Sequence, residues 1–274
     1  MMILTAENYF SREANMQYMS ASQWKAFRKC EAAALAQVRG EYFSEATTAM
    51  LIGSYVDAAF EGTLDVFSAK HPELFKKDGT LKADYVHAQE IIARLEEDEL
   101  YMLLMSGEKQ VIKTGVIAGV PFKTKMDSLL SAEQTAEIAK RFPECAEALG
   151  FLDGAIVDQK IMRDMQPLWV EDVGRQNFVE AWGYNYQGAI YRAVDGRLLP
   201  FIIAAGTKEQ ACDLEAISIP DADLDEALAE VEETAPRYQA IKDGLIPPER
   251  CGKCPHCRAT KKLTKIISWK ELEV

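Results

Sequence analysis

The sequence predicts an α/β fold with a mixed central sheet flanked by helices. Two observations lead to this prediction. Short apolar segments rich in β-branched residues, around Asp127 and Asp158, have the character of strands. Longer segments before and after them repeat their apolar residues every three or four positions, as amphipathic helices do. A chain of 274 residues, of which 48% are hydrophobic, is long enough to bury a sizeable core within one large domain.

The first third of the chain is predicted to be helical. A helix is expected over residues 20–38, with Ser20 or Ser22 as its N-terminal cap. Two further helices are expected over residues 47–60 and 83–105, because both stretches space their apolar residues at helical intervals.

The sheet is predicted to begin with a hairpin. Residues 110–116 and 120–130 are expected to pair across a turn at Ala118-Gly119. A helical insertion is expected over residues 133–149, and a buried strand over residues 154–162. The later elements expected are a helix over residues 175–192, strands over residues 198–205 and 214–219, and a long helix over residues 221–242 with Asp221 as its cap.

Two charged residues interrupt the apolar strand over residues 154–162. Asp158 and Lys160 are two positions apart, so both project from the same face of the strand. Burial of a carboxylate and an ammonium is costly unless they pair or bind a metal. Together with Asp127 on the neighbouring strand, they form the set that metal-assisted phosphodiester cleavage needs. The alternative interpretation is a plain salt bridge between a lysine and a nearby acid.

The predicted helix over residues 175–192 favours the first interpretation. It carries a polar and aromatic stripe at steps of three and four residues, which suits a site better than a core. The residues of this stripe are Gln176, Glu180, Tyr184, Gln187 and Tyr191.

Asp127, then Asp158-Gln159-Lys160, then Gln187-Gly-Ala-Ile-Tyr191 resembles the PD-(D/E)xK nuclease superfamily. The Gln-x-x-x-Tyr helix is similar to that of its RecB-like and RecE-like exonuclease branch, of phage or prophage type. Upstream, residues 51–57 resemble the helix in which this branch usually carries a metal-facing histidine. This chain has Asp57 there. The resemblance implies a restriction-endonuclease-like core.

The resemblance also implies roles for these residues. Asp127, Asp158 and Lys160 would be catalytic, and Asp127 and Asp158 would bind Mg²⁺ or Mn²⁺. Asp57 would be a third ligand, since an aspartate can also bind Mg²⁺. Gln187 and Tyr191 would contact the DNA.

The resemblance suggests three regions. Residues 1–105 would be an N-terminal helical region that contributes to the core, and residues 106–245 would be the nuclease core. Residues 246–274 would be a cysteine-rich tail. No apolar run approaches the ~20 residues of a membrane span, and the N-terminus lacks the features of a signal peptide. We therefore expect a cytoplasmic protein without a membrane segment.

A net charge of −12 is unusual for a protein that binds DNA, because neutralised phosphates supply much of the affinity. The acids cluster in two runs, at residues 96–99 and 221–233, that are expected to be solvated helix faces. The basic residues expected near the site are Lys109, Lys113, Lys123, Lys125, Arg175 and Arg192.

The C-terminal tail contains Cys251-Gly-Lys-Cys254-Pro-His-Cys257. Three thiols at this spacing favour a metal site, and the spacing matches the loops of iron–sulfur proteins. His256, which suits zinc, and the distant Cys30 are the candidates for a fourth ligand. The resemblance favours Cys30 and a 4Fe–4S cluster, since iron–sulfur members of the branch take one cysteine from an N-terminal helix. Free thiols are the alternative.

Three functions are compatible with these features. The first is a metal-dependent DNA exonuclease that acts on duplex ends in recombination or repair, together with a single-strand annealing protein. The second is an iron–sulfur nuclease that acts on single-stranded or flapped DNA. The third is a non-catalytic protein that binds DNA ends on a nuclease scaffold. The resemblance to RecE-type enzymes also suggests a homo-oligomer that closes around DNA as a ring.

Overall fold

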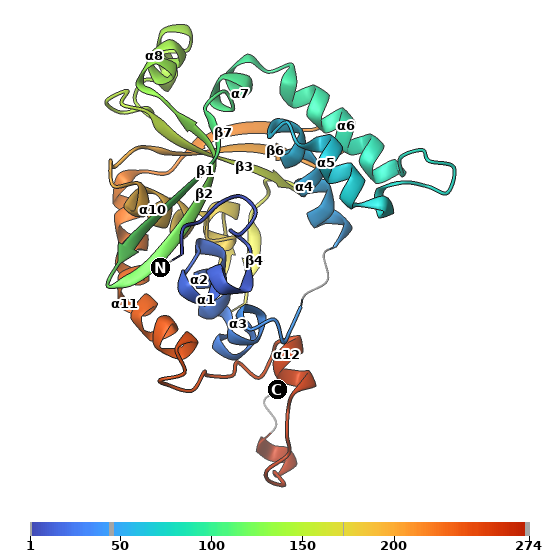
Figure 1. Ribbon diagram of the computed structural model, residues 1–274, viewed down its shortest axis with the longest axis vertical. Coiled ribbons are helices and arrows are strands. Elements are labelled where there is room, and N and C mark those ends of the chain that lie inside the picture. Colours follow the sequence, from blue (N-terminus) through green and yellow to red (C-terminus); the bar gives the residue numbers. More distant parts are fainter. Residues whose placement is uncertain (1, 44–46, 172, 272–274) are drawn as a thin grey trace.

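A computed structural model describes residues 2–43, 47–171 and 173–271. Its centre is a five-stranded sheet in the order β1-β2-β3-β6-β7 (Figure 1). β3 and β6 are parallel, and the other neighbouring pairs are antiparallel. The mixed sheet confirms the predicted fold class. Its strands are β1 (Glu108–Ile117), β2 (Val120–Leu130), β3 (Ala155–Met162), β6 (Phe201–Thr207) and β7 (Leu214–Ser218).

Helices pack on both faces of this sheet (Figure 1). α10 and α11 lie on one face, and α4 and α6 lie on the other. None of the helices in the described part of the chain is long and apolar enough to cross a membrane. The helices are α1 (Arg12–Gln17), α2 (Ala21–Lys29), α3 (Glu31–Val38), α4 (Thr48–Phe60), α5 (Leu64–Lys70), α6 (Ala83–Glu96), α7 (Glu99–Leu104), α8 (Ala132–Arg141), α9 (Phe178–Ala181), α10 (Tyr184–Asp195), α11 (Asp221–Lys242) and α12 (Pro255–Ala259).

β6 separates two hydrophobic cores. All seven of its residues are buried, and alternate side chains enter opposite layers because successive strand residues point to opposite faces. Phe201 and Ile203 pack in the core beneath α10 and α11. Ile202 and Ala204 pack in the core beneath α4 and α6. This double burial explains why the segment is apolar throughout rather than alternating.

β2 and β3 diverge, and this divergence makes room for a site. Only residues 128–130 of β2 pair with β3, opposite residues 155–157. Farther along β2, the chain before α2 takes the place of β3. Met19 donates its N–H to the Pro121 carbonyl at 2.8 Å and accepts from the Lys123 N–H at 2.8 Å. The N-terminal segment is thus held across the opening between the two strands.

Three predicted helices are interrupted in the structure. The helix expected over residues 20–38 is two helices, because Cys30 is extended at φ −166°. The helix expected over residues 83–105 restarts at Asp98, whose side chain caps α7 by accepting from the Tyr101 N–H at 2.8 Å. Gly183, at φ 63°, separates α9 from α10 in the segment expected to be one helix over residues 175–192.

Several elements differ from the predictions at their ends or were not predicted. Residues 174–176 belong to β5 (Gly174–Gln176), which pairs with β4 (Leu168–Val170), so the predicted helix over residues 175–192 is wrong at its start. Asp221 is the first helical residue of α11, and Pro220 occupies the cap position instead. In the predicted insertion, α8 ends at Arg141 and a 3-10 turn follows. The elements that sequence analysis did not predict are α1, α5, β4, β5 and α12.

Candidate active site

Asp158 and Lys160 project from the same face of β3, as their spacing predicts. The Asp158 carboxylate is 2% exposed, and its Oδ2 forms an ion pair with Lys160 Nζ. Its Oδ1 accepts a hydrogen bond from Gln187 Nε2 at 2.6 Å. A buried charge needs such partners. The salt bridge considered from the sequence is therefore present, but it does not explain the other acids that gather beside it.

Asp127 lies on β2 at the point where β2 leaves β3. Its Oδ2 accepts from the Gln159 N–H at 3.0 Å, and its Oδ1 accepts from Gln110 Nε2 at 3.3 Å. The Asp127 carboxylate thus accepts a backbone N–H of β3 at the point where the backbone pairing of β2 with β3 has ended. Burial, and next the negative charge of Asp158, raise the pKa of Asp127 to about 7, against the opposing effect of Lys160.

α4 and the residue that caps its C-terminus supply two more acids to the same place. Asp57 and Glu61 are one helical turn apart, and both line one cavity with Asp127. Burial, followed by the charge of Asp127, raises the pKa of Asp57 well above its usual range. Sequence analysis did not identify Glu61. The available signal was its position four residues after Asp57, which places both side chains on one helix face.

The chemistry of these acids suits a divalent cation. Carboxylate oxygens are the ligands that Mg²⁺ prefers. Burial is the main cause of the raised pKa values of Asp57 and Asp127, and repulsion between the carboxylates, which Lys160 does not fully balance, adds to it. A cation placed among Asp57, Asp127 and Asp158 would relieve this repulsion.

α10 contributes the two residues predicted to contact DNA. Gln187 is hydrogen-bonded to Asp158 and also lines the cavity. Tyr191 lines the cavity too, but its hydroxyl donates to the Lys125 carbonyl at 3.1 Å, on the stretch of β2 that β3 has left. Tyr191 therefore stabilises the open edge of β2. Of the other stripe residues, Tyr184 lies against Lys160, with Nζ 5.3 Å from the ring centroid. Gln176 and Glu180 do not line this cavity.

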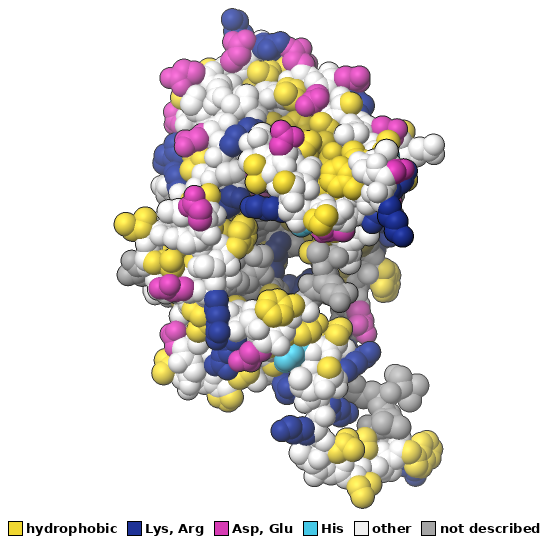
Figure 2. Space-filling view, turned by 45° about the vertical axis from the view of Figure 1, so that its right-hand side comes forward, with side chains coloured by type: hydrophobic (Ala, Val, Ile, Leu, Met, Phe, Trp, Pro, Cys, Tyr) yellow, Lys and Arg dark blue, Asp and Glu magenta, His cyan; other side chains and the backbone are white. Residues whose placement is uncertain are grey.

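The cavity has a volume of about 480 Å³ and has an acidic end and a basic end. The basic end contains Lys25 of α2 and Lys123 and Lys125 of β2. Lys25 Nζ donates to the Trp182 carbonyl at 3.2 Å and lies 5.3 Å from the centroid of the Tyr184 ring. Figure 2 shows the hollowed surface of the molecule, with Lys and Arg side chains in its wall.

The six basic residues expected near the site have different surroundings. Lys123 and Lys125 line the cavity, but Lys123 is buried and donates to the Tyr9 carbonyl and to Asn15. Lys113 pairs with Asp195. Arg192 is buried on α10, joins α10 to α11 through Asp221 and Asp225, and does not line the cavity. Lys109 donates to the Met105 carbonyl, and Arg175 lies on β5; neither lines the cavity.

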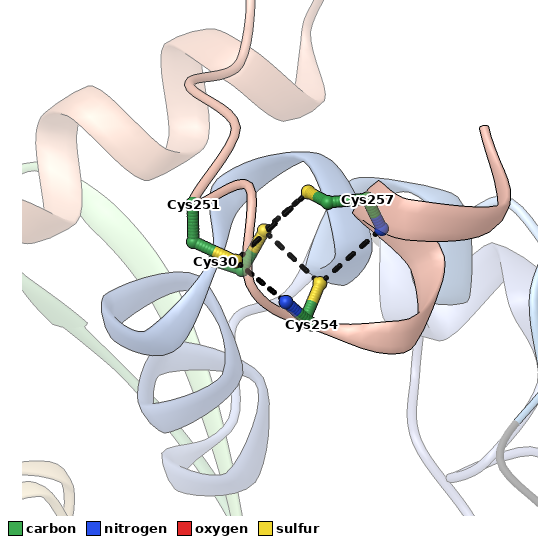
Figure 3. Close-up of side chains that lie close together, drawn as sticks. All are labelled: Cys30, Cys251, Cys254 and Cys257. Atoms are coloured by element: carbon green, nitrogen blue, oxygen red, sulfur yellow. Dashed lines mark hydrogen bonds between the residues drawn. The ribbon is translucent and has the colours of Figure 1, made fainter. Parts of the chain in front are cut away.

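Four cysteines form a second cluster. Cys30, Cys251, Cys254 and Cys257 place their Sγ atoms within 4.8 Å of one another (Figure 3). The tail thus returns to the junction of α2 and α3. His256, the other candidate for a fourth ligand, packs against the ring of Tyr42 instead, with centroids 5.1 Å apart.

An α/β core with two sheet acids, a lysine beside them and a glutamine helix above defines a nuclease of the PD-(D/E)xK type. A family model described as a PDDEXK-like domain of unknown function matches residues 20–138 and 149–260, and the chain belongs to this family. The unmatched residues 139–148 overlap the insertion predicted over residues 133–149.

The chain is similar to a solved structure along nearly its whole length. That structure is the crystal structure of a protein from Eubacterium rectale described as a "Putative exonuclease". The two chains are 42% identical, the alignment covers 98% of this chain and 97% of that chain, and the TM-score is 0.85. No functionally curated protein matches the sequence. The family and this neighbour both support a nuclease.

Proposed function

We propose that this protein is a metal-dependent DNA exonuclease that hydrolyses phosphodiester bonds at DNA ends during recombination or repair. The observation that carries the proposal is the gathering of three acids and a lysine at one place. Asp57 and Asp127 line one cavity, and the ion pair of Asp158 and Lys160 lies close enough to affect the pKa of both. The name of the Eubacterium rectale relative supports the exonuclease part.

Asp127 and Asp158, with Asp57 from α4, would hold Mg²⁺ or Mn²⁺. When bound, the cation would polarise the phosphate and lower the pKa of a water molecule. Gln187 keeps Asp158 oriented by its hydrogen bond to Oδ1, which leaves Oδ2 toward Lys160.

Lys160 would act as a cation rather than as a proton acceptor. Burial lowers its pKa, but the attraction of Asp158 and then of Asp127 outweighs burial and raises the pKa above the ordinary value. The ammonium therefore stays charged at any physiological pH. It can offset negative charge that develops on the phosphate, or orient the attacking water.

Lys25 and Lys125 would bind phosphates of the DNA. Neither forms an ion pair with a carboxylate among the residues the structure describes, and both face the cavity from its basic end. Lys125 Nζ lies 5.5 Å from the ring centroid of Phe10, an exposed aromatic at the cavity on which a base could stack. These local cations would compensate for the acidic charge of the whole chain.

The test is cleavage of end-labelled duplex and single-stranded DNA, with closed circular DNA as the substrate that lacks ends. We expect digestion of the linear DNA with Mg²⁺ or Mn²⁺, none with EDTA, and no digestion of the circle. Asp158→Asn and Lys160→Ala should each lose activity by on the order of 10²–10³ or more. The exposed carboxylate of Asp153, just before β3, provides the control variant Asp153→Asn.

Thermal unfolding should accompany these assays, since Lys160→Ala leaves a buried carboxylate unpaired. Full activity in a folded Lys160→Ala protein would refute the assignment. Absence of cleavage under every metal condition would instead favour the non-catalytic end-binding protein. Preference for single strands or flaps would favour the second function considered from the sequence.

A further inference from the structure

The four clustered cysteines come from two distant parts of the chain. Cys30 is the single extended residue between α2 and α3, and its side chain is 7% exposed. Cys251, Cys254 and Cys257 lie on the tail, where Cys254 caps α12. Figure 3 shows the four thiols directed toward a common centre.

The separations of the sulfur atoms indicate how many metal ions they can hold. The Sγ atoms of Cys30 and Cys257 are 3.5 Å apart, those of Cys30 and Cys254 are 3.8 Å apart, and those of Cys251 and Cys257 are 3.9 Å apart. One tetrahedral zinc ion with Zn–S bonds of about 2.3 Å would place its sulfur ligands about 3.8 Å apart. A four-iron cluster binds each thiolate to a different iron atom, which requires wider spacing.

We propose that these four cysteines bind one zinc ion as a closed structural site, and not the iron–sulfur cluster that the resemblance implies. The proposal rests on the cysteine geometry alone and does not depend on the nuclease function. Four protein ligands fill a tetrahedral coordination sphere and leave no position for substrate, which is typical of structural zinc.

The surroundings of the thiols support a built site. The Cys254 N–H donates to Cys251 Sγ at 3.3 Å, and the Cys257 N–H donates to Cys254 Sγ at 3.4 Å. Such outer hydrogen bonds orient thiolate ligands. Arg250 donates to the Cys257 carbonyl at 2.8 Å and to Thr260, which fixes α12.

The tail is also attached to α3 beside the cysteines. Glu31, the first residue of α3, accepts from the Glu249 N–H at 2.7 Å and pairs with Arg237 of α11 at 2.7 Å. The metal would complete this attachment and hold the α2–α3 junction. α2 in turn supplies Ser22, Gln23 and Lys25 to the cavity. The zinc site would thus support the wall of the cavity from outside.

Metal analysis of the full-length protein, purified without air, tests the proposal. We expect one zinc per chain, neither iron nor inorganic sulfide, and no visible absorbance. Replacement of the zinc by Co²⁺ should produce the absorption bands of a tetrahedral cobalt–thiolate site. Cys30→Ser and Cys257→Ser should lose the zinc and melt at a lower temperature.

Three control variants should keep one zinc: His256→Ala, Cys212→Ser outside the cluster, and Asp158→Asn, which shows that the zinc is not in the carboxylate site. If the cysteine variants fail to fold, thiol modification of the wild-type protein replaces them, and it should release one zinc per chain. Iron with sulfide in the purified protein would overturn the proposal. So would one iron without sulfide, zinc retained in Cys30→Ser, or zinc lost in His256→Ala.

Discussion

At the scale of single residues, two lysines beside one tyrosine differ in their acid–base behaviour. The Nζ atoms of Lys160 and Lys25 each lie 5.3 Å from the centroid of the Tyr184 ring. The acids hold Lys160 in its charged form. Burial, and next the charge of Lys160, lower the pKa of Lys25 to about 8, and Asp158 compensates only in part. The charge of the Lys25 ammonium is therefore only partly compensated, and a phosphate of the substrate would compensate the rest.

Lys25→Ala is expected to weaken binding to DNA by a similar factor whatever the base sequence of the DNA. The slope of log affinity against log salt concentration should fall by about 1, as for the loss of one phosphate contact. Lys25→Arg should retain much of the binding, and the exposed Lys29 on the same helix provides the control Lys29→Ala. Binding to end-labelled DNA with Ca²⁺ in place of Mg²⁺ measures the effect. Equal salt slopes for Lys25→Ala and wild type would contradict this role.

Asp127 is expected to make the stability of the metal-free protein depend on pH. Its pKa is about 7 in the folded state, against ~3.9 for an unfolded aspartate. Between these values the folded state binds more protons, so the contribution of Asp127 to stability is present at low pH and is lost as pH rises through 7. Asp127→Asn should therefore raise the melting temperature in EDTA more at pH 8 than at pH 5.

The same proton should compete with the metal. Mg²⁺ binding to the wild-type protein, followed by calorimetry, should weaken as the pH falls through about 7, because the ligand carboxylates must be ionised. A stabilisation by Asp127→Asn that is identical at pH 5 and pH 8 would show that the pKa of Asp127 is not raised.

At the scale of elements, the end of α11 holds the N-terminal segment in place. Lys242, the last residue of α11, is 2% exposed, and it donates to the Tyr18 carbonyl at 2.9 Å and to Gln23 at 3.3 Å. Gln23 in turn donates to Asn15 at 3.0 Å, and Lys123 donates to Asn15 from β2. This chain of hydrogen bonds joins α11, the N-terminal segment and β2 around the basic end of the cavity.

Lys242 is expected to destabilise the fold at neutral pH compared with alkaline pH. Burial, and next the charge of Lys123, lower its pKa from 10.5 to about 7. Between these values the folded state binds fewer protons than the unfolded state, so stability rises with pH. The free energy of unfolding of wild type should therefore increase from pH 7 to pH 9 relative to that of Lys242→Met. Urea titrations measure this difference, with Lys29→Met as an exposed control, and a constant difference would contradict the lowered pKa.

At the scale of the whole molecule, the charge of −12 must be reconciled with a nucleic-acid substrate. The acids of α11 lie mostly on exposed positions, whereas Lys25 and Lys125 face the cavity. A closed ring of several copies would gather such cavities around a channel and keep the acidic helices outside.

We therefore predict a homo-oligomer that encircles duplex DNA. Light scattering coupled to gel filtration should give a mass that is a small multiple of 30.6 kDa, and the mass should not fall at moderate salt. The mass of the Cys30→Ser protein shows whether assembly depends on the attachment of the cysteine-rich tail to Cys30. A strict monomer at micromolar concentration, with and without DNA, would eliminate the ring.

The sequence by itself determined the features that depend on local periodicity. The hairpin of β1 and β2 follows from its turn, and the common face of Asp158 and Lys160 follows from alternation along a strand. The buried strand β6 follows from a continuous apolar run. Gln187 and Tyr191 share one face of α10 because they are one helical turn apart. Breaks in helices were not visible, because an apolar repeat continues across a single extended residue such as Cys30, or across Gly183.

Only the tertiary structure decided which faces meet. Asp57 and Glu61 reach Asp127 because α4 packs against β3, and Lys25 reaches the cavity because the N-terminal segment replaces β3 beside β2. Cys30 joins the tail because Glu31 and Arg237 fix the tail to α3. A repeat in the sequence specifies which side of an element is apolar or polar. Contacts between residues far apart in the chain decide which element packs against that side, and no local pattern in the sequence encodes these contacts.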